Sequence, residues 1–243
     1  MMAGLLVASL VGGCGPAPPR ATVTVFAAAS LKKTFTVIGD EFTKANPGTT
    51  IEFSFGGSSD LVTQLTQGAH ADVFASADTA NMDKAAKAGL VAGDPVNFAS
   101  NVLTIVVAPD NPQQITSVAD LARPGLNVVV CAPQVPCGAA TRRIETLTAV
   151  SLTPVSEESS VTDVLNKVTS GQADAGLVYV TDAIGAGDKV TVVAVPEASR
   201  AVNTYPIAVL KGAENAAAAG EFVAMVTGPR GQKVLAEAGF GKP

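Results

Sequence analysis

The stretch VTVFAAASL, residues 23–31, passes from a run of alternating apolar residues directly into the start of a helix. Residues Thr22 to Phe26 are β-branched or aromatic, which predicts a strand. Ser30 is a favourable N-cap residue, so we expect a helix from Leu31 to Lys44. Asn46-Pro47-Gly48 would end that helix. A strand followed at once by a helix is the repeating unit of α/β proteins.

The same alternation continues along the chain and predicts an α/β fold. Further strands are expected at residues 51–55, 72–76, 102–108, 128–131, 176–180, 190–195 and 205–210, with helices in most of the intervals. Two helices, at residues 213–226 and 229–237, are expected to close the chain. This number of elements suggests two lobes, each a mixed sheet flanked by helices.

Lobe one is expected to be formed by two separate segments of the chain and lobe two by a single segment. Lobe one would take residues 22–101 together with 206–243, and lobe two would take residues 102–205. The chain would then cross between the lobes near Asn101 and near Tyr205-Pro206. Such an arrangement places a ligand cleft between the two lobes.

Composition and charge exclude several classes of function. The chain has 243 residues, of which 47% are hydrophobic and 15% charged, so it can bury a globular core. A net charge of −5 creates no field that would attract nucleic acid, so we expect no nucleic-acid partner. With a single histidine, His70, a site of several histidines around a metal is excluded. An anion site must therefore rely on local dipoles.

The beginning of the chain resembles an export signal. The apolar run from Ala3 to Val11 is too short to span a bilayer but suits a signal peptide, which we expect at residues 1–13. The sequence Val-Gly-Gly-Cys, ending at Cys14, resembles a bacterial lipobox, in which the cysteine receives the lipid. Residues 14–21 would then be a proline-rich tether. The protein would be exported and anchored to the outer face of the cell membrane as a lipoprotein; the alternative is a plain secretion signal.

Two cysteines remain if Cys14 carries lipid. Cys131 and Cys137 enclose a short loop with two prolines, and an exported compartment permits disulfides. A disulfide between them and a pair of free thiols are both compatible with the sequence.

Two junctions in the first part of the chain have the features of an anion site. Ser30 and the run from Gly56 to Ser59 each follow a strand and open a helix. A helix N-terminus carries unsatisfied N–H donors and about half a positive charge, and such ends lie at the carboxyl edge of a sheet, where α/β proteins bind ligands. The alternative is that each serine only caps its own helix.

Lobe two has a matching pair of junctions. Residues Val135 to Gly138 precede one helix, and Ser159-Ser160-Val161 opens another. Tyr179, at the end of a strand, would add a hydroxyl donor, unless it is simply a core or interface aromatic. Four helix N-termini would thus converge on one cleft.

Several segments together resemble the molybdate-binding proteins of ABC transporters. Residues 23–31 are similar to the opening strand of that family, SFGGSS at residues 54–59 to its second serine motif, and GAHADVFASAD at residues 68–78 to a further stretch in which His70 replaces a proline. Segments 177–183, 205–209 and 228–240 also match. The resemblance covers about residues 22–241, and it is specific only when the motifs are taken together.

The resemblance implies a two-lobed type II periplasmic-binding-protein fold that closes on a tetrahedral oxyanion. Ser30 and Ser58 match the two ligand serines, each offering a hydroxyl and an N–H, and Tyr179 matches the ligand tyrosine. Cys137 and Val161 match positions that donate a backbone N–H, although the family often has alanine where Cys137 stands. The ligand would be molybdate or tungstate, with no cofactor and no directly coordinated metal.

The implied partner is the membrane permease of an ABC importer, served by a monomeric binding protein without enzymatic activity. A sulfate-type oxyanion-binding protein is the main alternative, because sulfate is also a tetrahedral acceptor. An enzyme is a second alternative, in which Cys131 or Cys137 would work with His70 as a thiol hydrolase. His70 and the cysteines are expected in different lobes, which argues against that enzyme.

Overall fold

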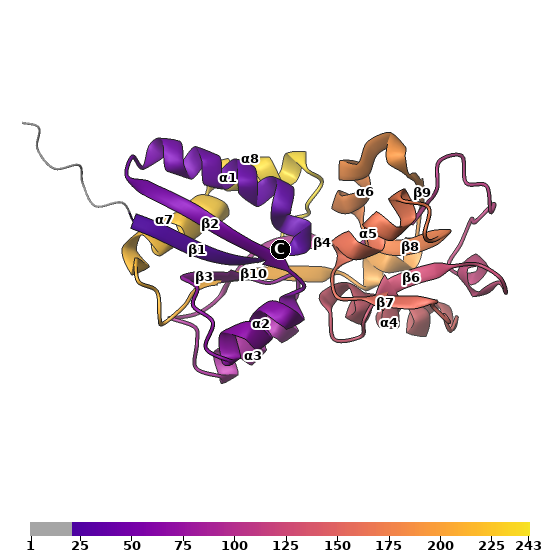
Figure 1. The fold of residues 1–243 in the computed structure, drawn as a ribbon, viewed down its shortest axis with the longest axis horizontal. Helices are drawn as coiled ribbons and strands as arrows, with labels where there is room; N and C mark the ends of the chain where they lie inside the picture. The colour runs from indigo at the N-terminus through magenta and orange to yellow at the C-terminus, as the bar shows by residue number, and fades with distance from the viewer. Residues whose placement is uncertain (1–20) are drawn as a thin grey trace, which may run out of the picture.

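The computed structural model describes residues 21–243, which form two lobes lying side by side (Figure 1). The expected signal peptide, the lipidation site Cys14 and most of the expected tether lie outside the described residues. Each lobe contains one mixed, five-stranded sheet flanked by helices. The α/β, two-lobed fold class is therefore confirmed.

The first lobe is built on the sheet β2-β1-β3-β10-β4. Its strands are β1 (Ala21–Ala28), β2 (Thr49–Gly56), β3 (Val73–Ala75), β4 (Val96–Asn101) and β10 (Asn203–Val209). Strands β1, β2 and β3 are parallel, while β10 runs antiparallel to β3 and β4. Helices α1 (Lys32–Ala45), α7 (Ala216–Thr227) and α8 (Pro229–Glu237) cover one face, and α2 (Ser58–Thr66) and α3 (Thr79–Lys87) cover the other (Figure 1).

Aromatic side chains fill the core under α1 and α7. The ring of Phe35 lies 5.8 Å from that of Phe98 and 6.0 Å from that of Phe222, measured between centroids. Phe42 meets Phe222 edge-on at 5.6 Å. Edge-to-face pairs of this kind stabilise a core beyond the area they bury. The carboxyl ends of β1 and β2 are thereby held on a rigid support.

The second lobe is built on the sheet β7-β6-β8-β5-β9. Its strands are β5 (Leu103–Val107), β6 (Val128–Cys131), β7 (Ser156–Glu158), β8 (Ala175–Tyr179) and β9 (Thr191–Val193), and its helices are α4 (Pro136–Thr148), α5 (Val161–Thr169) and α6 (Val180–Ala186). Short 3-10 turns lie at Ala119–Ala122, Gly187–Lys189 and Pro196–Arg200. Strand β6 is parallel to β7 and β8, whereas β5 is antiparallel to β8 and β9.

The sheets are joined by two connections. Val102 alone separates β4 from β5, and the second connection runs from the turn at Pro196–Arg200 into β10. Strand β10 begins at Asn203, two residues before the start that its apolar residues suggest. Asn203 and Thr204 are held in the strand by pairing with Asn101 and Ser100 of β4. The first residues of β10 therefore lie beside the boundary between the lobes.

Among residues 21–243, no helix combines the length and the apolar character needed to cross a bilayer.

Candidate functional site

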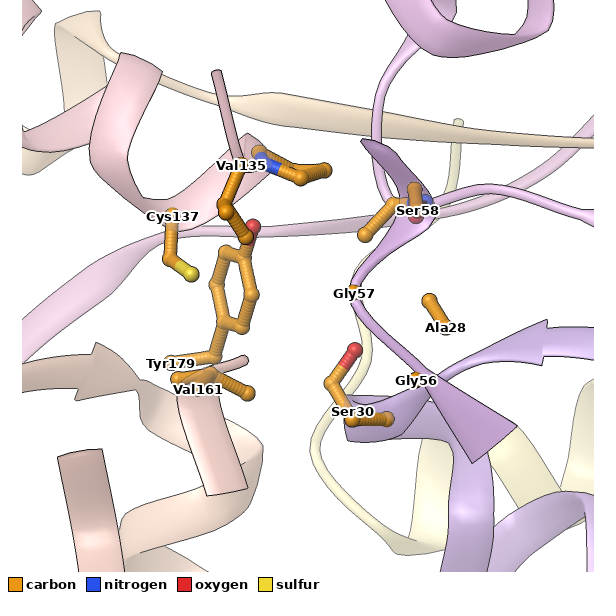
Figure 2. A pocket seen from close by; sticks show the side chains of 12 residues that line it. Ala28, Ser30, Gly56, Gly57, Ser58, Val135, Cys137, Val161 and Tyr179 are labelled. Carbon is orange, nitrogen blue, oxygen red and sulfur yellow. Dashed lines mark hydrogen bonds between the residues drawn. The ribbon is translucent and has the colours of Figure 1, made fainter. Parts of the chain in front are cut away.

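A small pocket lies where the two lobes face each other, and all five residues expected to bind the ligand line it. Figure 2 shows Ser30 and Ser58 on the side of the first lobe, opposite Cys137, Val161 and Tyr179 of the second. The remaining lining residues are Ala28, Ala29, Gly56, Gly57, Ala77, Val135 and Pro136. The free volume is about 10 Å³, roughly the space of one water molecule. The lobes are thus drawn closely together.

Ser30 is not the N-cap that the sequence suggested. It lies within a 3-10 turn, Ala29–Leu31, and α1 begins only at Lys32 with Leu31 in the N-cap position. Its side chain makes no capping bond; instead its Oγ lies 3.1 Å from the hydroxyl of Tyr205. Figure 2 shows the Ser30 hydroxyl directed toward the space between the lobes. The extra turn frees this hydroxyl from its own helix.

Ser58 is the first residue of α2, and Gly57 holds the N-cap position. The side chain is buried, and its Oγ accepts a hydrogen bond from the N–H of Ala77 at 3.0 Å. A hydroxyl that accepts one bond can still donate its own proton. Ser58 can therefore offer an O–H donor to a ligand in the pocket.

The second lobe supplies backbone donors at two helix starts. Cys137 follows Pro136 in the first turn of α4, and Val161 is the first residue of α5. Backbone N–H groups in the first turn have no partner within the helix. Ser160 caps α5 by accepting a bond from the N–H of Asp163 at 3.3 Å. Both helix ends therefore direct free donors and positive dipole ends toward the pocket.

Cys131 and Cys137 form a disulfide, with their Cα atoms 5.6 Å apart. The bond ties the end of β6 to the first turn of α4. Neither Cys131 nor Cys137 therefore has the free thiol that the thiol-hydrolase alternative requires. His70 lies elsewhere, with its Nε2 atom 2.9 Å from the carbonyl oxygen of Gly212 in the first lobe.

Two glycines allow backbone segments to approach at the pocket, and the sequence did not single out this role. A Cβ added at Gly138 would lie 2.0 Å from the carbonyl oxygen of Ala132. A Cβ at Gly57 would lie 2.1 Å from the carbonyl oxygen of Ser159, which belongs to the other lobe. Both separations are far inside van der Waals contact. Gly138 thus sets the start of α4, and Gly57 lets the lobes meet.

Tyr179 ends β8 and is buried, with its ring 5.9 Å from that of Tyr205. Burial is the main cause that raises the pKa of Tyr179 well above its usual value, and the neighbouring Tyr205, Asp78 and Asp182 raise it further. The phenol therefore stays protonated and can donate. Burial also raises the pKa of Asp182 to about 7, although the N–H of Tyr179 donates to it at 3.2 Å and Lys33 lies near it.

The residues that line the pocket include no lysine, arginine, aspartate or glutamate. No group of three or more histidine, cysteine, aspartate or glutamate side chains within residues 21–243 is placed to hold a metal ion. The pocket therefore offers neutral O–H and N–H donors from both lobes. Such a donor set suits an anion whose oxygens are all acceptors.

Comparison with known families agrees with this geometry. The family model of the bacterial extracellular solute-binding proteins matches residues 23–241. The chain belongs to this family.

Among individual relatives is the molybdate-binding protein ModA of Mycobacterium tuberculosis. It is 58% identical to this solute-binding protein over an alignment of 252 residues, which covers 100% of this chain and 97% of ModA. Two solved structures share the fold. The periplasmic molybdate-binding protein of Azotobacter vinelandii has a TM-score of 0.80 at 23% identity, covering 91% of this chain and 99% of its own. The sulfate-binding protein SubI of Mycobacterium tuberculosis has a TM-score of 0.80 at 22% identity, and the match covers 91% of this chain and 86% of the SubI chain.

Proposed function

We propose that this solute-binding protein captures molybdate outside the cytoplasm and delivers it to an ABC importer. The observation that carries the proposal is the convergence of Ser30, Ser58, Cys137, Val161 and Tyr179 on one pocket without a charged lining side chain. The 58% identity to a molybdate-binding protein over the whole chain supports molybdate among the possible oxyanions. Sulfate is the alternative ligand, and the sulfate-binding structure above is similar in fold alone.

The binding energy would come from hydrogen bonds to a dianion. Ser30 and Ser58 would each donate an O–H and an N–H, Tyr179 an O–H, and Cys137 and Val161 an N–H each. A charge-assisted hydrogen bond contributes about 1.5–3 kcal/mol, so this set gives on the order of 10–20 kcal/mol before costs. Desolvation of the dianion and ordering of the lobes offset much of this. A dissociation constant between micromolar and nanomolar follows.

Selectivity would depend on protonation state and on size. A fully deprotonated oxyanion satisfies a pocket made only of donors. Singly protonated phosphate brings an O–H that meets no acceptor, so it should bind poorly. Sulfate is all-acceptor but smaller, so several donors would be stretched. Tungstate is nearly the size of molybdate, and we expect little discrimination between the two.

The lobes must move for the ligand to enter. Residues of both lobes line the pocket, so a ligand can reach it only when the lobes separate. On closure, the backbone at Gly57 would again meet the carbonyl oxygen of Ser159. Ligand would favour one degree of closure, which a membrane permease can recognise.

Isothermal titration calorimetry of residues 21–243 with molybdate, tungstate, sulfate and phosphate tests this function. We expect tight binding of molybdate and tungstate, weak binding of sulfate and no heat with phosphate. Tight sulfate binding without molybdate heat would contradict the assignment. The protein should also leave each of these anions chemically unchanged.

We also propose that the protein is an exported lipoprotein, anchored through Cys14 after removal of residues 1–13. The support is the apolar run that ends in Val-Gly-Gly-Cys. A Cys14→Ala variant expressed in a bacterial host should move from the membrane fraction to the soluble fraction. Unchanged fractionation would exclude this anchor.

A further inference from the structure

Asn203 connects three residues that line the pocket, although it does not line the pocket itself. Its side chain is 2% exposed and lies at the start of β10, beside the boundary between the lobes. Its amide nitrogen, Nδ2, lies 2.8 Å from the hydroxyl oxygen of Tyr179 and 2.9 Å from the carbonyl oxygen of Ala77. The carbonyl oxygen of Pro136 is 3.3 Å away. One amide thus contacts both lobes.

The surroundings determine which way this amide faces. A guanidinium nitrogen of Arg143, on α4, donates to Asn203 Oδ1 at 2.5 Å and to the carbonyl oxygen of Ala201 at 3.3 Å. A guanidinium has donors only, so the oxygen of the amide must face Arg143. The carbonyl oxygens of Ala77 and Pro136 are acceptors only, so the opposite side must carry the NH₂ group. Both sides require the same orientation.

The orientation has a consequence for Tyr179. Because the NH₂ group of Asn203 can only donate, the Tyr179 oxygen must accept from it, and the phenol proton must point to a different acceptor. The neighbouring hydroxyl of Tyr205 is one acceptor for this proton, and a bound oxyanion would be a stronger one because it is charged. The raised pKa of Tyr179 keeps that proton in place.

We propose that Asn203 is a positioning residue that makes Tyr179 a donor to the bound oxyanion and holds Ala77 and Pro136 at the pocket edge. This inference rests on the proposed oxyanion-binding function. Asn203 does not touch the ligand; it acts through the polarity of its amide. A residue with an acceptor in place of the NH₂ group would reverse the direction of the Tyr179 hydroxyl.

The variant Asn203→Asp makes this reversal with almost no change of shape. One carboxylate oxygen can still accept from Arg143, but the other would now accept the Tyr179 proton and face two carbonyl oxygens. We expect the dissociation constant for molybdate to rise at least about 100-fold at pH 8, measured by calorimetry on residues 21–243. The native protein is measured beside it at every pH.

The pH profile separates positioning from simple packing. Burial favours the neutral form of the new carboxyl, which when protonated can again donate, whereas the guanidinium of Arg143 favours the charged form. The ratio of variant to native dissociation constants should therefore fall as the pH is lowered from 8 to 6. Asp182, whose pKa is raised to about 7 mainly by burial, and the ligand itself are present in both measurements, so their titration largely cancels from this ratio.

The second part of the test combines Asn203→Asp with Tyr179→Phe. In Tyr179→Phe there is no hydroxyl to reverse. Adding Asn203→Asp to this variant should therefore raise the dissociation constant for molybdate by a clearly smaller factor than it does in the native protein. The proposal would be overturned if Asn203→Asp raised the dissociation constant by the same factor in the native protein and in Tyr179→Phe, and if the ratio of variant to native dissociation constants did not change with pH. If the native protein binds molybdate and Asn203→Asp binds equally well, this inference fails alone; if the native protein binds no oxyanion, the proposed function fails.

Discussion

Gly138→Ala is expected to weaken molybdate binding by about 100-fold or more and to lower the thermal stability of the ligand-free protein. The new Cβ would lie 2.0 Å from the carbonyl oxygen of Ala132 and 2.6 Å from that of Cys131. Neither can move easily, because the Ala132 N–H is bonded to the Glu158 carbonyl at 2.9 Å and Cys131 is held in β6 by its pairing with β7. The start of α4 must shift instead, and the Cys137 N–H shifts with it.

The magnitude follows from the cost of overpacking. Such substitutions typically cost about 1–3 kcal/mol and more where backbone is displaced. For a chain of this size, 1 kcal/mol lowers the melting temperature by about 2–4 °C. When the Cys137 N–H is displaced, the hydrogen bond that it is proposed to donate to the anion is also lost, and this lowers the affinity further. Calorimetry and a thermal melt without ligand measure the two effects separately.

Gly220→Ala is the matched control for this prediction. Gly220 lies inside α7, and a Cβ there would meet no atom within 4 Å. Alanine is the better helix former by about 1 kcal/mol, so this variant should bind molybdate normally and be no less stable than the native protein. Native-like binding and melting of Gly138→Ala would show that the close approach at α4 is not required.

The double variant Ser30→Ala with Ser58→Ala is expected to lose molybdate affinity by about 10² to 10⁴-fold. Each hydroxyl is proposed to donate one charge-assisted bond of about 1.5–3 kcal/mol, and every 1.4 kcal/mol is a factor of ten. Backbone N–H groups at both positions remain, so residual binding should persist. The measurement is calorimetry with molybdate and tungstate.

Ser59→Ala is the control for the serine variants because it removes a hydroxyl from the next residue along the helix. Ser59 is 6% exposed, it does not line the pocket, and its Oγ has no hydrogen-bond partner among residues 21–243. Its removal should leave affinity unchanged. If the double variant bound molybdate as the native protein does, the serine hydroxyls would not be ligand donors.

Much of the site was predictable because the carboxyl ends of parallel strands meet at one edge of a sheet. Ser30 follows β1, and Ser58 follows the neighbouring strand β2. The strand–helix junctions before Cys137 and Val161 obey the same rule in the second lobe. These four residues line one pocket, together with Tyr179. Local sequence indicated these junctions because a helix start points its donors outward whatever its surroundings, whereas the resemblance to the molybdate-binding family indicated the particular residues.

Other features could not be predicted from local sequence. Strand β7 has three residues, Ser156–Glu158, two of them charged, so it carries no hydrophobic pattern and forms only by pairing with β6. Strand β4 was missed for a similar reason, since asparagine and serine interrupt its apolar residues. Ser30 was expected to cap its helix, but the extra 3-10 turn and the hydroxyl of Tyr205 changed its role.

The amino-acid sequence by itself determined the α/β alternation and the strand–helix junctions that carry the donors. Only the tertiary structure decided that Gly138 must lack a side chain, that Gly57 meets Ser159 across the lobes and that Asn203 orients Tyr179. The reason is the range of the forces. Propensity and helix dipoles act over a few residues, whereas the contacts of Gly57 and Asn203 join distant parts of the chain, Ala77 and Asn203 being 126 positions apart.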